Sequence, residues 1–330
     1  MVMEKGKALL IKGDGLIISR GYWLKDKQVN YKVSDKKYAL PSRLALTRRF
    51  LRAEITSFYC LGNDNQLAIA KKGFFLRKKG DKSFEKRFSM PRGSKPLNLC
   101  FSPSGNIYFG EYFQNRGKQA VNIYRSEDNA QTWHIVYTFA EGEINHIHGI
   151  FLDPFTERMW VVTGDRENEC IIGYTEDEFN SFVEVFRGGQ EFRTCLLFFY
   201  ENFIVFATDS QYVQNEIRCF DRNTLEIESL VNIQGSAIKG GQKYNVSFLS
   251  TTVEPSKVNT DQYAHVWVTK DGKHWKEVFS AKKDCWPAIF QFGTFEFPQY
   301  DTPISDKLYF SGRALKGCDG KTICIDISDL

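Results

Sequence analysis

The pattern of hydrophobic and polar positions along the chain is that of short β-strands. Apolar or alternating runs of about four to eight residues recur through the sequence. Between them lie clusters of Asn, Asp, Ser, Gly and Pro, such as Asn63-Asp64-Asn65 and Ser102-Pro103-Ser104-Gly105, which are typical of tight turns. The pattern therefore predicts an all-β chain.

The runs group into units of four strands. The predicted units span residues 55–88, 96–139, 147–186, 193–233, 244–280 and 288–327. The last unit is one strand short, and the N-terminal residues 7–33 contain short β runs, one of which is free to complete it. We therefore predict a single domain over residues 1–330. In it, residues 1–50 are closing strands and a connector, and residues 51–330 are the repeated units.

One short motif recurs near the last strand of several units. It is clearest at Ser126-Glu127-Asp128-Asn129-Ala130-Gln131-Thr132-Trp133. Residues 175–182 keep its frame, residues 269–275 are a copy one residue shorter, and Ser83-Phe84 keeps only its end. The terminal aromatic residues are spaced 49, 49 and 93 residues apart, and the last spacing is close to two periods. A fixed period indicates an array of like structural units.

The motif resembles the Asp-box, or BNR repeat, which is the hairpin signature Ser-x-Asp-x-Gly-x-Thr-Trp of sialidase-type β-propellers. In such a turn, short Ser and Asp side chains bond back to nearby backbone amides. Ala130 stands where the family has Gly, so we expect Asn129 to adopt the left-handed backbone conformation instead. The resemblance implies a six-bladed β-propeller, with seven blades as the alternative, closed by an N-terminal strand.

The resemblance does not extend to the sialidase catalytic motifs. That family carries an Arg-Ile-Pro motif in its first blade, and Leu40-Pro41-Ser42-Arg43 does not match it. Sialidase activity is therefore not expected. The resemblance implies the superfold, and a superfold does not fix the chemistry.

Composition narrows the partners and the compartment. The formal net charge is only +4, which suggests neither nucleic-acid binding nor membrane binding. No apolar run approaches 18 residues, and the start of the chain shows no signal-peptide pattern. The eight cysteines are scattered singly without a Cys-x-x-Cys pair, which excludes zinc-ribbon and thioredoxin motifs and suits a reducing cytoplasm. We predict a cytoplasmic protein.

Blade topology predicts where a functional site would lie. In an antiparallel blade, the starts of first strands and the ends of second strands converge on one face, around the central channel. The Asp-box turns lie on the other face. First strands begin near Arg92, His146, His148, Arg193 and Trp286, and second strands end at Glu111, Asp165, Asp209 and Arg313. We interpret this set as the channel mouth, although solvation of a propeller rim or structural salt bridges also account for polar residues there.

The roles follow from residue type. His146 and His148 are two residues apart on a strand, so their imidazoles face the same way. With Asp165 or Glu111 they could ligate a divalent metal, but binding or acid–base work is favoured, and no cofactor is predicted. The predicted catalytic residues are Glu111, Asp165, Asp209, His146 and His148. The predicted ligand-binding residues are Arg193, Arg92, Arg313 and Trp286.

Three functions fit this pattern. The first is a carbohydrate-active enzyme, a glycoside hydrolase or polysaccharide lyase in intracellular or surface-polysaccharide metabolism. The second is a non-catalytic propeller that binds a carbohydrate or another polar, anionic small ligand at the same mouth. The third is a protein-assembly propeller, which a large exposed apolar patch would favour. The sequence leaves the substrate and the oligomeric state open.

Overall fold

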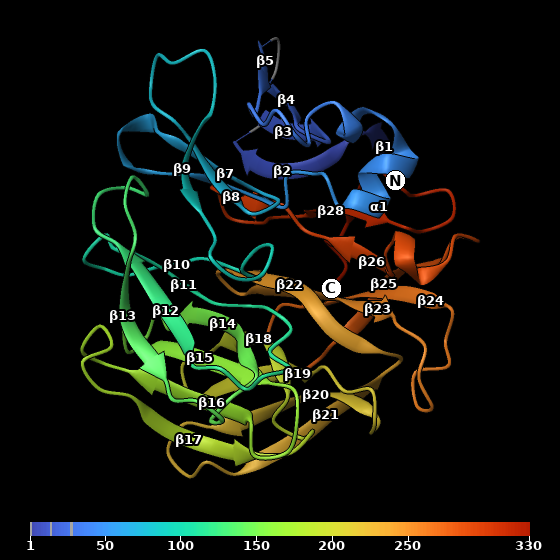
Figure 1. The fold of residues 1–330 in the computed structure, drawn as a ribbon. Helices are drawn as coiled ribbons and strands as arrows, with labels where there is room; N and C mark the ends of the chain where they lie inside the picture. The colour runs from blue at the N-terminus through green and yellow to red at the C-terminus, as the bar shows by residue number, and fades with distance from the viewer. Residues whose placement is uncertain (1, 14, 27–28) are drawn as a thin grey trace. The chain divides into compact units, whose positions relative to one another are not determined.

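A computed structural model describes residues 2–13, 15–26 and 29–330 of the chain (Figure 1). Residues 1, 14, 27 and 28 belong to the predicted domain range but lie outside the described residues. The chain divides into two compact units: unit 1 comprises residues 1–89 and 239–330, and unit 2 comprises residues 90–238. Each unit is described by itself, and a single domain over residues 1–330 stays a prediction.

Unit 2 consists of three four-stranded antiparallel sheets with their strands in chain order (Figure 1, green to yellow). The first sheet holds β10 (Cys100–Phe101), β11 (Ile107–Gly110), β12 (Val121–Ser126) and β13 (His134–Phe139). The second holds β14 (His146–Leu152), β15 (Met159–Gly164), β16 (Cys170–Thr175) and β17 (Val183–Gly188). The third holds β18 (Thr194–Phe199), β19 (Phe203–Thr208), β20 (Asn215–Asp221) and β21 (Ile227–Ile233). Such four-stranded sheets are the blade unit of a β-propeller.

Burial in unit 2 follows the position of each strand in its sheet. Every residue of β15 and β18 is buried, whereas the fourth strands β13 and β17 are largely exposed. Apolar side chains of neighbouring sheets pack together, so that Trp160 and Val162 of the second sheet share a core with Leu197, Phe206 and Phe220 of the third. The near-continuous apolar runs of the first strands are therefore explained by burial on both faces.

Unit 1 contains the remaining sheets, apart from the first three residues of β22, Ser236 to Ile238, which fall in unit 2. The first of them holds β2 (Lys7–Lys12), β3 (Gly15–Arg20), β4 (Trp23–Asp26) and β5 (Val29–Lys32). In the same sheet, β27 (Gln299–Tyr300) runs parallel to β2. The second sheet holds β6 (Ser57–Cys60), β7 (Gln66–Ala70), β8 (Gly73–Arg77) and β9 (Glu85–Ser89). The third is an eight-stranded sheet that consists of two sets of four strands. One set is β22 (Ser236–Lys243), β23 (Val246–Val253), β24 (Tyr263–Thr269) and β25 (Lys276–Lys282). The other set is β26 (Gly293–Glu296), β28 (Lys307–Arg313), β29 (Lys321–Asp326) and β1 (Val2–Lys5). The helical segments η1 (Pro41–Arg43), α1 (Ala45–Leu51), η2 (Gly62–Asp64) and η3 (Ala288–Phe290) are short. Among the described residues, no helix has the length and hydropathy needed to cross a membrane.

The N-terminal strand completes the last set of strands. β1 pairs antiparallel with β29, with Val2 opposite Cys324 and Lys5 opposite Lys321. This pairing confirms the prediction that an N-terminal strand supplies the strand that the C-terminal unit lacks. Without β1, the backbone of β29 would present an open sheet edge.

The closing strand lies at residues 2–5, upstream of the β runs of residues 7–33 from which it was expected. Those runs belong to β2 to β5, which form one sheet with β27. Ala8 to Ile11 and Ile17 to Ser19 are buried, as expected of inner strands rather than of an added edge strand. The described residues thus contain seven sets of four strands, which favours the alternative of seven blades over six.

Three turns share one hydrogen-bond pattern. In the first, the Ser126 hydroxyl accepts the Ala130 amide at 2.9 Å, and Asp128 Oδ1 accepts the Gln131 and Thr132 amides at 3.0 and 2.9 Å. Residues 175–181 and 269–274 repeat the arrangement. Asn129 has a positive φ as predicted, but Ala130 shares it, with φ values of 57° and 66°. The turn therefore uses two consecutive left-handed residues rather than Asn129 alone.

Candidate functional site

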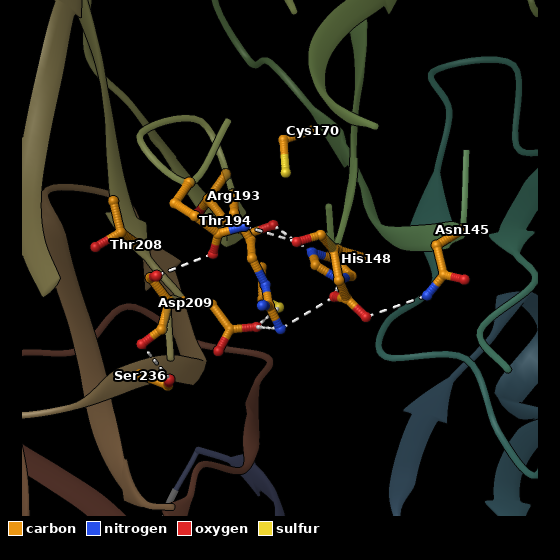
Figure 2. Close-up of polar contacts among 12 residues, drawn as sticks. Asn145, His148, Cys170, Arg193, Thr194, Thr208, Asp209 and Ser236 are labelled. Carbon is orange, nitrogen blue, oxygen red and sulfur yellow. Dashed lines mark hydrogen bonds and ion pairs between the residues drawn. The ribbon is translucent and has the colours of Figure 1, made fainter. Parts of the chain in front are cut away.

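Strand ends gather four of the predicted site residues in unit 2. The first strands β14 and β18 lie in contact with each other. His146 opens β14, Asp165 directly follows β15, Arg193 directly precedes β18, and Asp209 directly follows β19. Figure 2 shows His148, Arg193 and Asp209 joined in one polar network. We call His146, His148, Asp165, Arg193 and Asp209 the histidine–aspartate cluster.

The two histidines face each other at the centre of this cluster. Their Nε2 atoms lie 3.0 Å apart. The Nδ1 atom of His146 lies 2.9 Å from the carbonyl oxygen of Phe113, and that of His148 lies 2.8 Å from the carbonyl oxygen of Thr194. Both rings are almost completely buried, and the backbone carbonyl groups of two other segments fix their orientation.

Gly164 allows this approach. A Cβ atom at position 164 would lie 2.4 Å from Cε1 of His148, which is closer than side chains can pack. The Thr163-Gly164-Asp165 sequence therefore needs glycine at its centre, because the imidazole of His148 covers that backbone.

Asp165 connects the histidines to Arg193. Its Oδ1 atom lies 3.1 Å from Nε2 of His148, 3.4 Å from Nε2 of His146 and 3.0 Å from Nη2 of Arg193. Burial by itself would raise the pKa of Asp165, but the neighbouring His146 and His148 side chains outweigh it and hold the pKa well below its ordinary value. Its side chain is 30% exposed, which makes it the most accessible member of the cluster.

Arg193 and Asp209 form the deeper end of the cluster. Nη2 of Arg193 lies 3.6 Å from Oδ2 of Asp209, and the Cys195 thiol donates to the same oxygen at 3.4 Å. Burial alone would lower the pKa of Arg193, but the charges of Asp209 and Asp165 raise it. Burial raises the pKa of the Cys195 thiol well above its usual range, so this cysteine stays a neutral donor.

A pocket of about 260 Å³ opens beside Asp165 and Arg193. Its lining contains three arginines and one carboxylate, together with amide side chains and one tyrosine: Arg116, Arg166, Arg193, Asp165, Gln114, Asn115, Asn145, Gln211 and Tyr212. Tyr212 is 70% exposed. Asn145 donates to Asp165 Oδ2 at 3.1 Å and so links the pocket wall to the cluster.

Glu111 and Arg92 form a separate ion pair in the same unit. The guanidinium of Arg92 binds both carboxylate oxygens of Glu111, which also accepts the Asn122 amide at 2.9 Å. The Glu111 side chain is 1% exposed. The Glu111 carboxylate therefore binds Arg92 and the backbone of β12 and not the histidines. Its catalytic role stays a prediction.

Arg313 and Trp286 belong to unit 1. Arg313 lies 2.8 Å from Glu296 and 3.9 Å from Glu54, and Trp286 packs against the guanidinium of Arg49. Both residues therefore have partners within their own unit. Their predicted role as ligand-binding residues at the same mouth stays a prediction.

Sequence reasoning missed several residues around the cluster. These are Asn145, the carbonyl groups of Phe113 and Thr194, Cys195, Gln190, Arg116 and Arg166. Asn145, Thr194 and Arg166 each adjoin a residue that the sequence did mark, so extending each marked position by one residue would have found them. The carbonyl contacts leave no signal in the sequence, because any residue type provides a carbonyl group.

Two sets of side chains have the composition of a metal site within the described residues. The first is His146, His148 and Asp165, and the second is His148, Cys195 and Asp209. In each set, the potential ligand atoms lie within 4.8 Å of one another. The two sets share His148, whose Nε2 atom already faces the first.

Comparison with known proteins identifies the fold. The sequence matches no protein-family model and no curated protein. Among solved structures, the GH74 xyloglucanase of Xanthomonas campestris is similar with a TM-score of 0.55 and 13% identity, over 84% of this chain and 47% of that one. Nidogen in its laminin complex (TM-score 0.49, 10% identity, 82% and 89% covered) and a putative TolB of Agrobacterium tumefaciens (0.41, 11%, 71% and 82%) are weaker matches. The xyloglucanase is a β-propeller protein, and this chain has a β-propeller fold.

Proposed function

We propose that unit 2 binds an anionic carbohydrate, or a similar polyhydroxylated anion, in the pocket beside Asp165. The observation that carries the proposal is the pocket lining, which contains three arginines and only one aspartate. Guanidinium groups match carboxylate and phosphate oxygens in pairs of parallel hydrogen bonds. The lining therefore favours an anion.

The other lining residues suit hydroxyl groups. Gln114 and Gln211 line the pocket with amide side chains that carry both donor and acceptor atoms, whereas the amide of Asn115 is bonded to the backbone of Gln119 and that of Asn145 donates to Asp165. Tyr212 offers an exposed aromatic ring against which an apolar sugar face can pack. A volume of about 260 Å³ lies just below the usual range for ligand pockets and suits a ligand no larger than a single sugar ring.

Binding explains the cluster better than two-carboxylate catalysis does. Most glycoside hydrolases need one carboxyl group with a raised pKa as the acid. The accessible carboxyl, Asp165, has a lowered pKa, and the Glu111 carboxylate is bonded to Arg92 and buried. Hydrolase or lyase activity remains the alternative, with a histidine as the acid. The likeness to the xyloglucanase supports the fold and not this activity.

The turns support a finer assignment of the fold. We propose that the chain is a propeller of the BNR type, in which the three turns at residues 126–133, 175–182 and 269–275 are Asp-boxes. Their shared hydrogen bonds from backbone amides to a Ser or Thr hydroxyl and an Asp carboxylate support this.

Calorimetric titration with a sugar panel tests the binding proposal. Glucuronate, galacturonate and N-acetylneuraminate are compared with glucose and galactose. We expect at least one acidic sugar to bind at least tenfold more tightly than the neutral ones, and Arg116→Gln and Arg166→Gln to weaken that binding. Arg87→Gln, in unit 1, is the control and should change nothing. Equal affinity for acidic and neutral sugars, or no binding of either, would refute the proposal.

Protein assembly is a second candidate, favoured by one observation in unit 1. Large apolar side chains are exposed around α1: Leu40, Leu44, Leu46, Phe50 and Ile289. η1 and η3 both contact α1, and Phe50 packs on Phe290 with ring centroids 5.8 Å apart. Exposed apolar side chains gathered in this way are typical of interaction sites. Light scattering of the wild type and of Leu46→Glu would show whether copies associate through this surface.

A further inference from the structure

The hydrogen bonds of His146 and His148 assign their ring nitrogens. A carbonyl oxygen accepts hydrogen bonds and cannot donate. Because each Nδ1 lies within 2.9 Å of a carbonyl oxygen, each Nδ1 carries the hydrogen. Asn145 Nδ2 is also 3.2 Å from Nδ1 of His146, but that amide has its own acceptor in Asp165 Oδ2 at 3.1 Å. In the neutral rings, both Nε2 atoms therefore present lone pairs.

These lone pairs converge with a carboxylate oxygen. Nε2 of His146, Nε2 of His148 and Oδ1 of Asp165 form a triangle with sides of 3.0, 3.1 and 3.4 Å. Three acceptor atoms at such distances repel one another unless a cation lies among them. A proton on one Nε2 atom removes the repulsion in the two contacts of that nitrogen and leaves the third contact between two acceptors. A metal ion can accept a lone pair from all three atoms at once.

The size of the triangle is that of one face of a metal coordination sphere. Nitrogen and oxygen ligands lie about 2.0–2.2 Å from Zn²⁺. Neighbouring ligands at that distance are about 2.9–3.0 Å apart in octahedral geometry and about 3.4 Å apart in tetrahedral geometry. The three measured sides fall within this range. An ion could therefore bind without moving the side chains by more than a few tenths of an ångström.

We propose that His146, His148 and Asp165 bind one divalent transition-metal ion through Nε2, Nε2 and Oδ1. The ligand set of two imidazoles and one carboxylate suits Mn²⁺, Fe²⁺, Co²⁺, Ni²⁺ or Zn²⁺ rather than Mg²⁺ or Ca²⁺, which prefer oxygen ligands. The sequence had offered this site as the alternative to acid–base work, and the converging atoms now favour the metal.

The surroundings of the triangle are those of a built site. Metal-binding histidines usually donate their second N–H to a backbone carbonyl or a carboxylate, which fixes the ring. Both histidines do so here, to Phe113 and Thr194 (Figure 2 shows His148 and Thr194). Asn145 holds the other oxygen of Asp165. The two carbonyl groups come from segments outside the β14–β15 hairpin, whereas Asn145 and Asp165 face each other at the end of that hairpin, so the three ligand atoms are positioned before an ion arrives.

The charge of the cluster also favours a cation. Asp165 and Asp209 carry two negative charges and Arg193 carries one positive charge, which leaves a net charge of −1 with neutral imidazoles. Arg193 pairs with Oδ1 of Asp165, but it also pairs with Asp209, which partly neutralises the positive charge of the guanidinium group. A divalent ion would change the net charge to +1 at the wall of the pocket. There it would strengthen the binding of an anion, and this last step alone rests on the proposed function.

The test is titration of the full-length, chelator-treated protein with ZnCl2, MnCl2 and CoCl2. We expect one ion per chain and, for Co²⁺, a visible absorption band. Asp165→Asn and His148→Gln should weaken binding at least tenfold. His265→Gln is the matched control, because His265 lies 3.1 Å from Asp261 and 2.9 Å from Glu277 in unit 1. It should bind like the wild type.

Three results would overturn the metal site. These are no saturable binding by the wild type, binding that Asp165→Asn and His148→Gln both leave unchanged, and binding that His265→Gln removes. Asp165→Asn is the milder variant, because it keeps the shape of a partly exposed side chain, and it decides the matter if His148→Gln does not fold. Titration of the acidic sugars in the presence of chelator separates the two proposals, since sugar binding without metal binding would contradict only the metal site.

Discussion

At the residue scale, Asp165 decides what the cluster can do. It contacts both histidines and Arg193 and also lines the pocket. Its lowered pKa keeps it ionised, so it acts as an acceptor for cations and donors rather than as a source of protons. An ionised Asp165 fits a binding site, whereas acid catalysis by this carboxyl group would need it to be protonated.

Tyr212 provides a residue-scale prediction. Tyr212→Ala should weaken acidic-sugar binding by about three- to tenfold, because one aromatic contact is lost. The melting temperature should stay the same, because the ring is 70% exposed. Tyr244→Ala, at a tyrosine 69% exposed in unit 1, is the control. Equal losses of affinity in the two variants would show that Tyr212 has no special role.

The sequence predicted the positions of the site better than its contacts. Strand ends marked His146, His148, Asp165, Arg193 and Asp209, and the structure brings all five together. Glu111 occupied the same kind of position, but its carboxylate turns to Arg92. Strand position determines where the backbone of a residue lies. The partner of a long side chain depends on packing that one sequence does not show.

At the scale of elements, the structure explains why some turns matter. Asp153, in the turn between β14 and β15, pairs with Arg222, in the turn between β20 and β21. The two contacts are 2.5 and 3.0 Å long, and the Asp153 side chain is fully buried. Two sheets of unit 2 are thus joined by a buried ion pair.

Arg222→Met should lower the free energy of unfolding by about 3–5 kcal/mol at pH 7, because a buried carboxylate loses its partner. Burial raises the pKa of Asp153, but hydrogen bonds from Arg222 outweigh it and keep the pKa lowered. A lowered pKa stabilises the folded state above the unfolded value of about 4, and this contribution is lost as the pH falls. Urea unfolding should therefore show a smaller difference between variant and wild type at pH 4 than at pH 7.

Arg158→Met is the control for this measurement. Arg158 pairs with Glu176 at 2.5 Å, but both side chains are substantially exposed, so the change should stay within about 1 kcal/mol. The same loss for Arg222→Met at both pH values would mean that packing, and not charge, links the two turns.

Element-scale prediction from the sequence succeeded where strands alternate with clear turns. The units of residues 147–186 and 193–233 were predicted close to the observed limits of the second and third sheets of unit 2, residues 146–188 and 194–233. It failed at residues 7–32, because β4 is only four residues long and its Trp23–Asp26 sequence contains two charged residues. A strand of that kind gives too weak a pattern to complete a predicted sheet.

At the scale of the whole molecule, the chain has a β-propeller fold, and the pocket proposed to bind a ligand lies in unit 2. The four-stranded sheets supply rigid strand ends, and the pocket is lined by residues at those ends and in the loops that join the strands. The repeat of about 49 residues predicted this organisation from the sequence. It did not predict the ligand, because strand periodicity records packing and carries no information on the chemistry of the loops.

The most direct test of the binding claim is a crystal structure of the protein with the tightest-binding acidic sugar of the panel. The account predicts the sugar carboxylate beside Arg116, Arg166 or Arg193, with the ring against Tyr212. Sugar density elsewhere on the chain, with this pocket filled only by solvent at a saturating concentration, would contradict it.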